Sequence, residues 1–306
     1  MHHPAAPCPR TGLTADDSLT FSRIIAGMWR MQAWNLSPQQ RVSLIERCLE
    51  LGVSTFDHAD IYGDYGVESL FGEALSLAPS LRARMELVSK CGIKLTGGRN
   101  PGQSLNYYDT STAYIVAQAE QSLRNLRTDH LDLLLIHRPD PLMSFDEIAR
   151  AFELLRASGK VRHFGVSNFT RHQFECLNSR VALATNQIEF SPLHLAPLYD
   201  ETLDGLQNLW RAPMIWSPLA GGALLTATDE RAVRVRAALA TLAPQYGTSV
   251  AGLAFAWIMR HPARCMPLTG SGRIEAIAEA VHACGIAMSR EHWFTILHAS
   301  QGHPVP

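Results

Sequence analysis

The sequence has no excess of either charge. Its 27 Lys and Arg residues nearly match its 28 Asp and Glu residues, which leaves a net charge of −1 over 306 residues. A broad surface for nucleic acid or for an anionic membrane needs a surplus of basic side chains. The charge balance therefore excludes such a surface and restricts any anion site to a local one.

Long apolar runs and paired cysteines are also missing. No stretch reaches the ~18 to 20 apolar residues of a membrane span, and the first 17 residues contain no apolar segment typical of a secretory signal. The six cysteines form no C-x-x-C pair, and no histidine pair stands at zinc-ligand spacing beside one. We therefore expect free thiols, a cytoplasmic protein and no bound metal.

The composition is that of a globular protein, with 46% hydrophobic and 18% charged residues. No linker, charge block or low-complexity tract divides the chain. We expect a single domain over residues 1–306, in which residues 1–20 form an irregular N-terminal segment.

Short apolar segments alternate with segments of helical period. Strands are expected over residues 21–27, 53–57, 85–90, 131–137, 161–167, 182–190, 213–220 and 265–270. The helices that follow them are expected over residues 37–52, 65–77, 111–126, 144–159, 170–179, 199–210, 229–247 and 273–284. Eight such pairs, with continuous apolar strands, favour a (β/α)8 TIM barrel over an open sheet.

Helix boundaries carry local signals. Ser37 is expected to cap the first helix, with Pro38 at its first position and Gly52 at its end. Two further helices are expected, one over residues 249–262 and one at the C-terminus over residues 289–300, capped by Ser289. The second of these is an addition to the barrel.

Polar residues gather where the expected strands end, which is where a TIM barrel carries its active site. The strand ends hold Asp57, Lys90, His137, Ser167, Asn168, Gln187, Glu189, Ser217, Ser271 and Arg273, and Tyr62 lies in the loop after the second strand. Each of these residues alone also has a structural explanation. Their joint occurrence on successive strands indicates a site.

Four of these residues form a coherent set for proton transfer. A phenol is a poor acid near neutral pH, but a nearby cation lowers its pKa, so Lys90 is expected to tune Tyr62. An ammonium inside a protein needs a counter-charge, and Asp57 is available. The His137 imidazole can donate a hydrogen bond that orients a substrate carbonyl toward the phenol.

The chain resembles the aldo-keto reductase superfamily over nearly its whole length. The fragments that carry the resemblance are FDHADIYG, VSKCG, LLLIHRPDP, GKVRHFGVSNF, NQIEF and WSPLAGG. Among its members, the chain is similar to a subgroup of bacterial oxidoreductases, monomeric and often of unassigned substrate. The resemblance implies an oxidoreductase that transfers hydride from a nicotinamide cofactor to an aldehyde or ketone, without a Rossmann domain.

The resemblance also implies a role for each matching residue. Tyr62 would be the general acid, Lys90 and Asp57 its tuning pair, and His137 the orienting group. The nicotinamide would meet Ser167, Asn168, Gln187 and the stacking ring of Trp216, where the family usually has Tyr. The loop along the pyrophosphate would contain Ser217, Leu219, Gly221 and Leu224.

The segment LTGSGRIEA follows the last expected strand and opens a helix, where backbone N–H groups favour an anion. Ser271 and Arg273 are expected to hold the 2′-phosphate of NADP, which favours NADPH over NADH, and Gly270 is expected to bind the cofactor beside them. Ala276 stands where many relatives carry a second basic residue. Glu275 and Glu279 either approach the adenine or are solvated.

Other residues are expected at the rim or outside the site. Trp29 is the favoured wall of the substrate pocket, ahead of Trp34, and the glycine-rich loop over residues 94–108 is expected to shape that pocket. Arg138, Asp132 and Asp140 are expected to make structural contacts. His58 and Asp60 resemble a metal pair but lack a third ligand nearby.

Two other functions remain open at this level. The same scaffold could serve as an NADP(H)-sensing binding or regulatory subunit with vestigial chemistry, although a pure binder has no need of Lys90 beside Tyr62. A lyase or hydrolase that uses His137 with Glu189 is less favoured, because the sequence offers neither a metal site nor a nucleophile.

Overall fold

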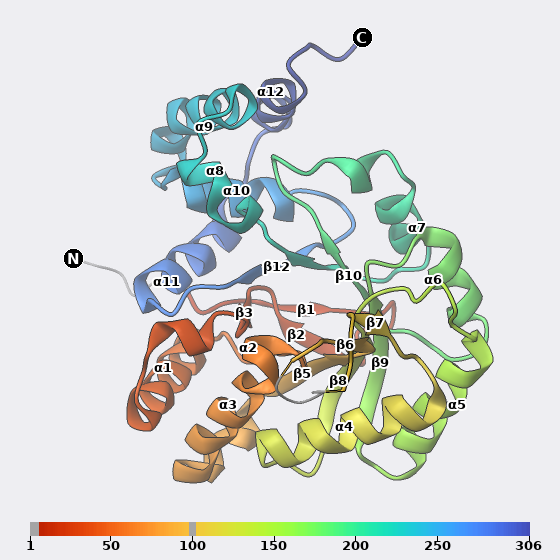
Figure 1. The fold of residues 1–306 in the computed structure, drawn as a ribbon. Helices are drawn as coiled ribbons and strands as arrows, with labels where there is room; N and C mark the ends of the chain where they lie inside the picture. The colour runs from red at the N-terminus through yellow and green to blue at the C-terminus, as the bar shows by residue number, and fades with distance from the viewer. Residues whose placement is uncertain (1–5, 98–101) are drawn as a thin grey trace.

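The computed structural model describes residues 6–97 and 102–306 (Figure 1). Residues 1–5 of the expected N-terminal segment and residues 98–101 of the glycine-rich loop lie outside the described part.

Eight parallel strands of the described chain close into a barrel in chain order, and the last strand pairs with the first. The strands are β3 Ile25–Gly27, β4 Thr55–Asp57, β5 Glu86–Cys91, β8 Leu131–Ile136, β9 Val161–Ser167, β10 Asn186–Glu189, β11 Met214–Trp216 and β12 Met266–Thr269. The expected (β/α)8 barrel is confirmed.

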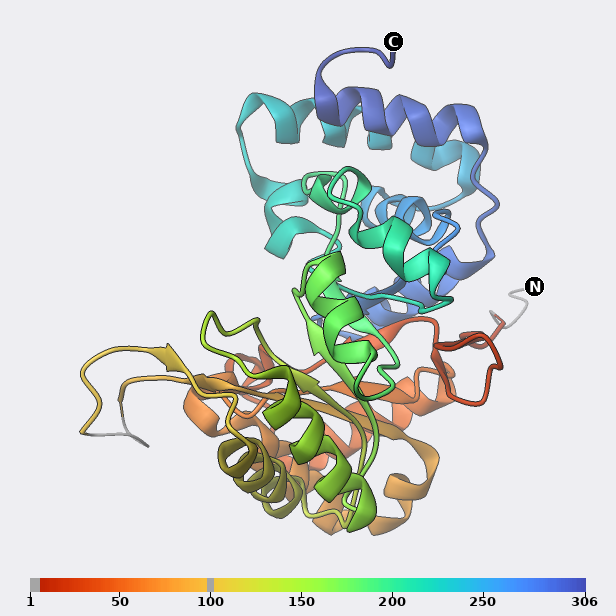
Figure 2. The same cartoon turned by 90° about the vertical axis from the view of Figure 1, so that its right-hand side faces the viewer.

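The helices surround this barrel (Figures 1 and 2). They are α1 Pro38–Glu50, α2 Tyr62–Tyr65, α3 Val67–Leu77, α4 Thr112–Leu126, α5 Phe145–Ala157, α6 Arg171–Asn178, α7 Thr202–Asn208, α8 Ala223–Thr226, α9 Glu230–Leu242, α10 Val250–Met259, α11 Ile274–His282 and α12 Arg290–Gln301. The C-terminal helix α12 is confirmed, with Ser289 as its N-cap.

The sequence signals around α1 act as expected. The Ser37 hydroxyl accepts a hydrogen bond from the Gln40 N–H, and the Gln40 side chain accepts one from the Ser37 N–H, which completes a capping box. Pro38 occupies the first turn. Gly52 follows the helix with φ of 77°, a left-handed conformation that glycine adopts without strain.

The N-terminal segment is more ordered than predicted. Arg10–Gly12 (β1), in the segment expected to be irregular, pairs in antiparallel register with Thr20–Ser22 (β2). The first expected strand, over residues 21–27, is thus divided: its start belongs to this hairpin, and Ile25–Gly27 (β3) belongs to the barrel. The hairpin exists because Leu13, Leu19 and Phe21 join a buried apolar cluster with inward residues of the barrel strands such as Val88 and Met214. This hairpin and its cluster form the floor of the barrel.

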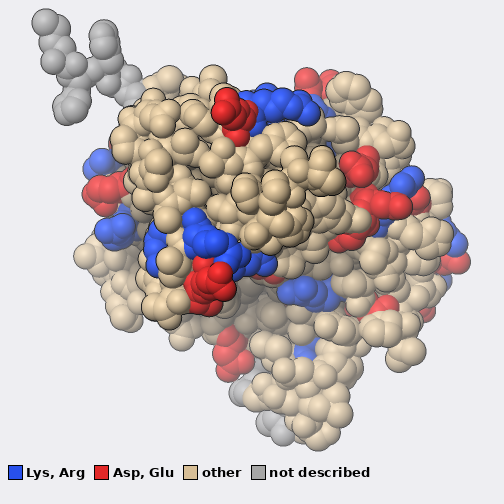
Figure 3. All heavy atoms as spheres, turned by 90° about the horizontal axis from the view of Figure 1, so that it is seen from above, with Lys and Arg blue, Asp and Glu red and all other residues tan. Residues whose placement is uncertain are grey.

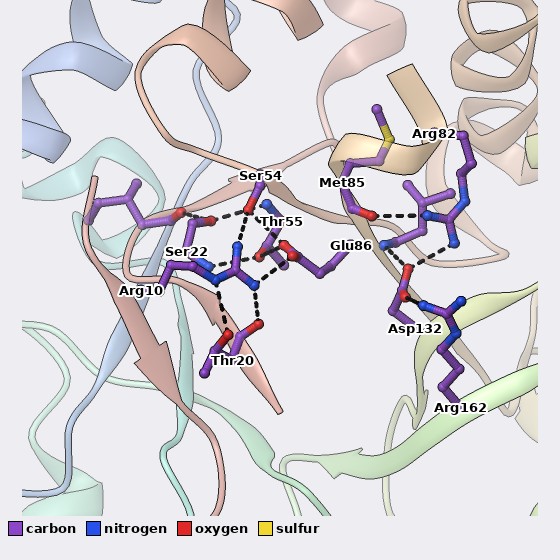
Figure 4. A network of polar contacts seen from close by, with 12 residues as sticks. Arg10, Thr20, Ser22, Ser54, Thr55, Arg82, Met85, Glu86, Asp132 and Arg162 are labelled. Atoms are coloured by element: carbon purple, nitrogen blue, oxygen red, sulfur yellow. Dashed lines mark hydrogen bonds and ion pairs between the residues drawn. The ribbon is translucent and has the colours of Figure 1, made fainter. Parts of the chain in front are cut away.

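A polar network fixes the amino ends of the strands near this floor (Figure 4). Glu86, at the start of β5, pairs with Arg10 and accepts hydrogen bonds from Ser54 and Thr55. Asp132 pairs with Arg82 and Arg162 and accepts the Leu87 N–H at 2.9 Å. The structural role expected of Asp132 agrees with these contacts.

A second hairpin lies at the opposite end of β5. It pairs Ile93–Lys94 (β6) with Tyr107–Tyr108 (β7), and the segment around it projects from the body of the molecule (yellow in Figure 2).

The face in Figure 3 carries basic and acidic groups side by side in a largely uncharged surface. Among the described helices, none combines the length and the apolar character that a membrane crossing requires.

Two tryptophans hold α12 on the rest of the fold. The rings of Trp257 and Trp293 stack with centroids 4.9 Å apart and an interplanar angle of 6°. Each indole N–H donates to the backbone carbonyl of the other residue at 3.0 Å. In both ribbon views α12 lies beside α9 (Figures 1 and 2).

His58 is a buried histidine whose ring makes no hydrogen bond. Its two ring nitrogens have no hydrogen-bond partner in the part of the chain that the structure describes, and the ring packs edge-on against Phe71 with centroids 4.5 Å apart. Burial, together with the charge of Lys90, lowers the pKa of His58 to about 3. The folded protein therefore holds this imidazole neutral through the whole mildly acidic range.

We predict that Trp293→Phe lowers the free energy of unfolding by about 1 to 2 kcal/mol, because it removes an N–H donor and leaves the Trp257 carbonyl without its partner. Urea unfolding followed by circular dichroism measures the change. The same substitution at Trp210, which is 62% exposed, should leave the midpoint nearly unchanged. Equal effects at the two positions would contradict the proposed clamp.

We predict that His58→Leu flattens the acid limb of the stability curve. Between pH ~6.5 and ~3 the unfolded chain binds a proton that the folded chain refuses, so the free energy of unfolding falls as the pH falls. Each pH unit in this window costs about 1.4 kcal/mol per such histidine. Unfolding midpoints at pH 4 to 6.5 measure the slope, with His282→Leu as the exposed control. An unchanged slope in His58→Leu would refute this account.

Candidate active site

Strand alternation decides which side chains enter the barrel. In β5, Leu87 and Cys91 lie in the core between strands and helices, whereas Val88 lies in the cluster inside the barrel. Since side chains alternate along a strand, Lys90 points inward one layer above Val88. In β11 the same rule puts Trp216 above Met214.

Lys90 is the centre of the inward layer. Its side chain is only 1% exposed, and its ammonium donates to an oxygen of Asp57 at 2.7 Å and to the backbone carbonyl of His58 at 2.7 Å. A third bond runs to the Tyr62 hydroxyl at 3.1 Å. Because the phenol oxygen accepts from Lys90, its own O–H remains free to donate elsewhere.

The second oxygen of Asp57 is also engaged. It accepts a hydrogen bond from the Gln187 amide at 2.8 Å. Gln187 comes from β10, on the other side of the barrel interior from β4. Through these two bonds the Asp57 carboxylate connects the Lys90 ammonium with β10, on the opposite side of the barrel from β4.

The charges of this group follow from burial and pairing. Burial opposes the charge on Lys90, but Asp57 and Tyr62 outweigh it and raise the Lys90 pKa above its ordinary value. For Tyr62, burial raises the pKa by more than the ammonium lowers it. Lys90 thus acts on the Tyr62 pKa in the expected direction, but burial outweighs it and the net shift is upward, so the phenol is protonated at neutral pH.

His137 stands against Tyr62. Its backbone N–H donates to the Cys91 carbonyl at 2.8 Å, and its ring meets the Tyr62 ring edge-on with centroids 6.0 Å apart. Burial and the charges of Lys90 and Arg138 hold the pKa of His137 well below its ordinary value. The ring is neutral, and its buried Nδ1 has no hydrogen-bond partner among residues 6–97 and 102–306.

A chain of polar contacts joins the residues expected around a nicotinamide. The Trp216 indole N–H donates to Asn168 Oδ1 at 3.0 Å, and the Asn168 amide donates to the Ser167 hydroxyl at 2.8 Å. That hydroxyl donates to the Gln187 carbonyl at 2.9 Å. Asn168 has a φ of 61°, which turns the chain away from β9 and presents its side chain to Trp216.

The loop after β11 is open and strongly turned. Ser217 has a φ of 50°, Gly221 of 67° and Gly222 of 107°. Nothing lies within 4 Å of a Cβ built on Gly221 or Gly222, so there is free space beside this backbone. Arg30, from the loop after β3, donates to the Gly221 carbonyl at 2.9 Å and connects the two loops.

The two leucines expected along this loop support it from below. Leu219 packs against the core, and Leu224 is fully buried in it. The Leu224 N–H donates to the Leu219 carbonyl, and the Leu224 carbonyl accepts from Arg236. The Leu224 side chain is therefore part of the core, beneath the loop that it was expected to line.

The segment after β12 is open beside part of its backbone. A Cβ built on Gly270 meets nothing within 4 Å, and the Ser271 hydroxyl accepts the Arg273 N–H at 3.1 Å. Arg273 itself is exposed at the start of α11. Gly272 packs so closely on Trp34 that an added Cβ would lie 2.6 Å from the indole.

Arg138 and Trp34 make contacts that differ from those expected of them. Arg138 was expected to make structural contacts, but its guanidinium lies over the Trp216 ring, 5.5 Å from the centroid. Trp34, the less favoured candidate for the pocket wall, packs against Gly272 in the loop after β12. Trp29 is 58% exposed, with the Arg30 guanidinium over its ring.

Metal ligands do not come together in the described part of the chain. No group of three or more His, Cys, Asp or Glu residues within residues 6–97 and 102–306 is arranged to hold a metal ion. All six cysteines are free thiols. His58, one half of the possible metal pair, is packed against Phe71.

Comparison with known proteins gives the family. The family model described as "Aldo/keto reductase family" matches residues 23–300. The oxidoreductase YdhF of Escherichia coli (strain K12) is 52% identical over 289 residues, which cover 94% of this chain and 96% of the relative. A 6-dehydroglucose reductase of Agrobacterium fabrum is 40% identical, over 96% of this chain and 99% of the relative.

Among solved structures, the glycerol dehydrogenase AKR11B4 of Gluconobacter oxydans has the same fold. The two superimpose with a TM-score of 0.83 at 23% sequence identity, over 98% of this chain and 97% of the other. The family model and the two relatives match nearly the whole chain, and the matched part includes all eight barrel strands and the polar residues at their ends. The chain belongs to the aldo/keto reductase family of oxidoreductases.

Proposed function

We propose that this protein reduces the carbonyl group of an aldehyde or ketone with NADPH, and that Tyr62 is the general acid. The observation that carries the proposal is the buried chain from Asp57 through Lys90 to the Tyr62 hydroxyl. A barrel that only bound a ligand would have no need of a buried ammonium against a phenol, because burying that charge is costly.

The residues at the mouth fit a nicotinamide dinucleotide. Trp216 offers an aromatic face, and Ser167, Asn168 and Gln187 offer amide and hydroxyl groups beside it. The free space beside Gly221, Gly222 and Gly270 would admit a pyrophosphate close to the backbone. When bound, NADPH would supply the hydride at its nicotinamide ring.

The protein's own residues supply the proton. Tyr62 is protonated at neutral pH and its O–H is free, so it can give its proton to the carbonyl oxygen as negative charge develops there. The adjacent ammonium of Lys90 stabilises the phenolate that remains, and Asp57 with Gln187 holds the ammonium in place. Neutral His137 can donate a hydrogen bond that orients the carbonyl.

A preference for NADPH rests on the segment after β12. Arg273 is exposed, and no ion pair to it is found in the described part of the chain. With Ser271 and the first N–H groups of α11, it can hold a 2′-phosphate. One basic side chain supports a moderate preference rather than an exclusive one.

The relatives guide the choice of substrates. The name 6-dehydroglucose reductase, at 40% identity, supports small oxygenated carbonyl compounds as the first candidates. We also propose that the protein acts as a monomer. A panel of small aldehydes and ketones, with NADPH and NADH in parallel, tests the activity directly.

We predict that Tyr62→Phe lowers kcat by 10² to 10⁴-fold while the protein still binds NADPH, because only the proton donor is lost. Stopped-flow turnover measures kcat, and quenching of tryptophan fluorescence measures binding. Tyr199→Phe, at a tyrosine that is 62% exposed, is the matched control. An unchanged kcat would remove Tyr62 from the mechanism, and binding without turnover in the wild-type protein would favour the NADP(H)-sensing alternative.

We predict that Arg273→Ala weakens NADPH binding about 10-fold and leaves NADH binding unchanged, because the lost contact is to the 2′-phosphate alone. Fluorescence titration with each nucleotide gives both dissociation constants in the same variant. If both constants rose equally, Arg273 would not distinguish the nucleotides.

A further inference from the structure

Arg138 is a cation at the barrel mouth without an ion pair. Within the described residues its guanidinium pairs with no carboxylate within 4 Å and donates no hydrogen bond, and it lies over the Trp216 ring. The residue is partly buried, so its charge is incompletely hydrated. A guanidinium in that position favours a partner that accepts hydrogen bonds.

Structural arginines in this fold are engaged differently. Arg82 donates to a threonine hydroxyl, two backbone carbonyls and the Asp132 carboxylate. Arg41 donates to Glu73 and to two backbone carbonyls. These side chains fix loops and helices by several bonds each, and Arg138 does nothing of this kind.

Acidic groups around the mouth are already paired. Asp57 uses one oxygen for Lys90 and the other for Gln187. Asp140, two residues after Arg138, accepts bonds from Thr110 and from the Leu142 N–H. Glu189 lies 3.8 Å from His194. Each of these three carboxylates has another partner, and none of them forms an ion pair with Arg138.

The guanidinium is placed beside the proposed reaction centre. Arg138 directly follows His137, whose ring stands against Tyr62. His137 contacts Tyr62 and Arg138 lies over Trp216, so two consecutive residues connect the proposed proton donor with the ring proposed to stack on the nicotinamide. The positive charge of Arg138 acts on the neighbouring imidazole and contributes to the lowered pKa of His137.

We propose that Arg138 is a specificity-determining residue, and that it binds an oxygen substituent of the substrate one or a few bonds from the carbonyl. Two groups share the required chemistry, a carboxylate and a pair of neighbouring hydroxyls, since both place two oxygens before the planar guanidinium fork. The substrates are then oxygenated aldehydes or ketones rather than apolar ones. This inference rests on the proposed reductase activity.

The test compares three aldehydes of similar size with NADPH: propanal, glyceraldehyde with its two hydroxyls, and succinic semialdehyde with its carboxylate. Arg138→Met removes the fork but keeps an unbranched side chain, and Arg138→Lys keeps the charge. Arg47→Met is the matched control, since Arg47 is a surface arginine with a 58% exposed side chain. Circular dichroism and NADPH binding verify that each variant is folded and competent.

We expect Arg138→Met to lower kcat/KM about 10- to 100-fold for an oxygenated aldehyde, mainly through KM, with propanal nearly unaffected. Arg138→Lys should recover part of the loss for succinic semialdehyde. A loss confined to glyceraldehyde identifies the hydroxyl pair, and one confined to succinic semialdehyde identifies the carboxylate.

An equal loss for propanal, or no loss for either oxygenated aldehyde, would overturn the assignment of Arg138. Failure of the proposed function is a separate outcome. In that case the wild-type protein itself would turn over none of the three aldehydes.

Discussion

The buried ammonium of Lys90 is the interaction on which the site depends. A charge inside a protein is tolerated only where hydrogen-bond acceptors replace water, and here the acceptors are a carboxylate, a backbone carbonyl and a phenol. They come from β4, from the residue after it and from α2. A slip of one residue between β4 and β5 would turn Lys90 outward into the apolar layer around Cys91.

The opposite end of the same strands protects that register. Near the floor of the barrel, at the amino ends of β5 and β8, Glu86 binds Arg10 and two hydroxyl groups, and Asp132 binds two arginines and the Leu87 N–H (Figure 4). The ionic contacts that hold the strands in place are thus separated along the strands from the groups at the mouth. This division between a stabilising floor and a chemical mouth is general to barrels of this kind.

Local patterns in the sequence predict most of the strands and helices of the barrel and several residues of the site. Alternation and capping residues place the eight strands, α1 and α12, and strand ends identify Asp57, Lys90 and His137 as neighbours. The hairpin of β1 and β2 escapes such reading, because its strands have three residues each and become ordered only on the barrel floor. The bond from Gln187 to Asp57 needs the closed barrel, and the pKa direction of Tyr62 depends on burial that no pattern gives.

The closed floor has a kinetic consequence. The β1–β2 hairpin and the apolar cluster above it fill the barrel beneath Lys90. Because this side is filled, a molecule can approach and leave Lys90 only from the mouth of the barrel. A molecule bound next to Lys90 can therefore leave only when the space between it and the mouth is free.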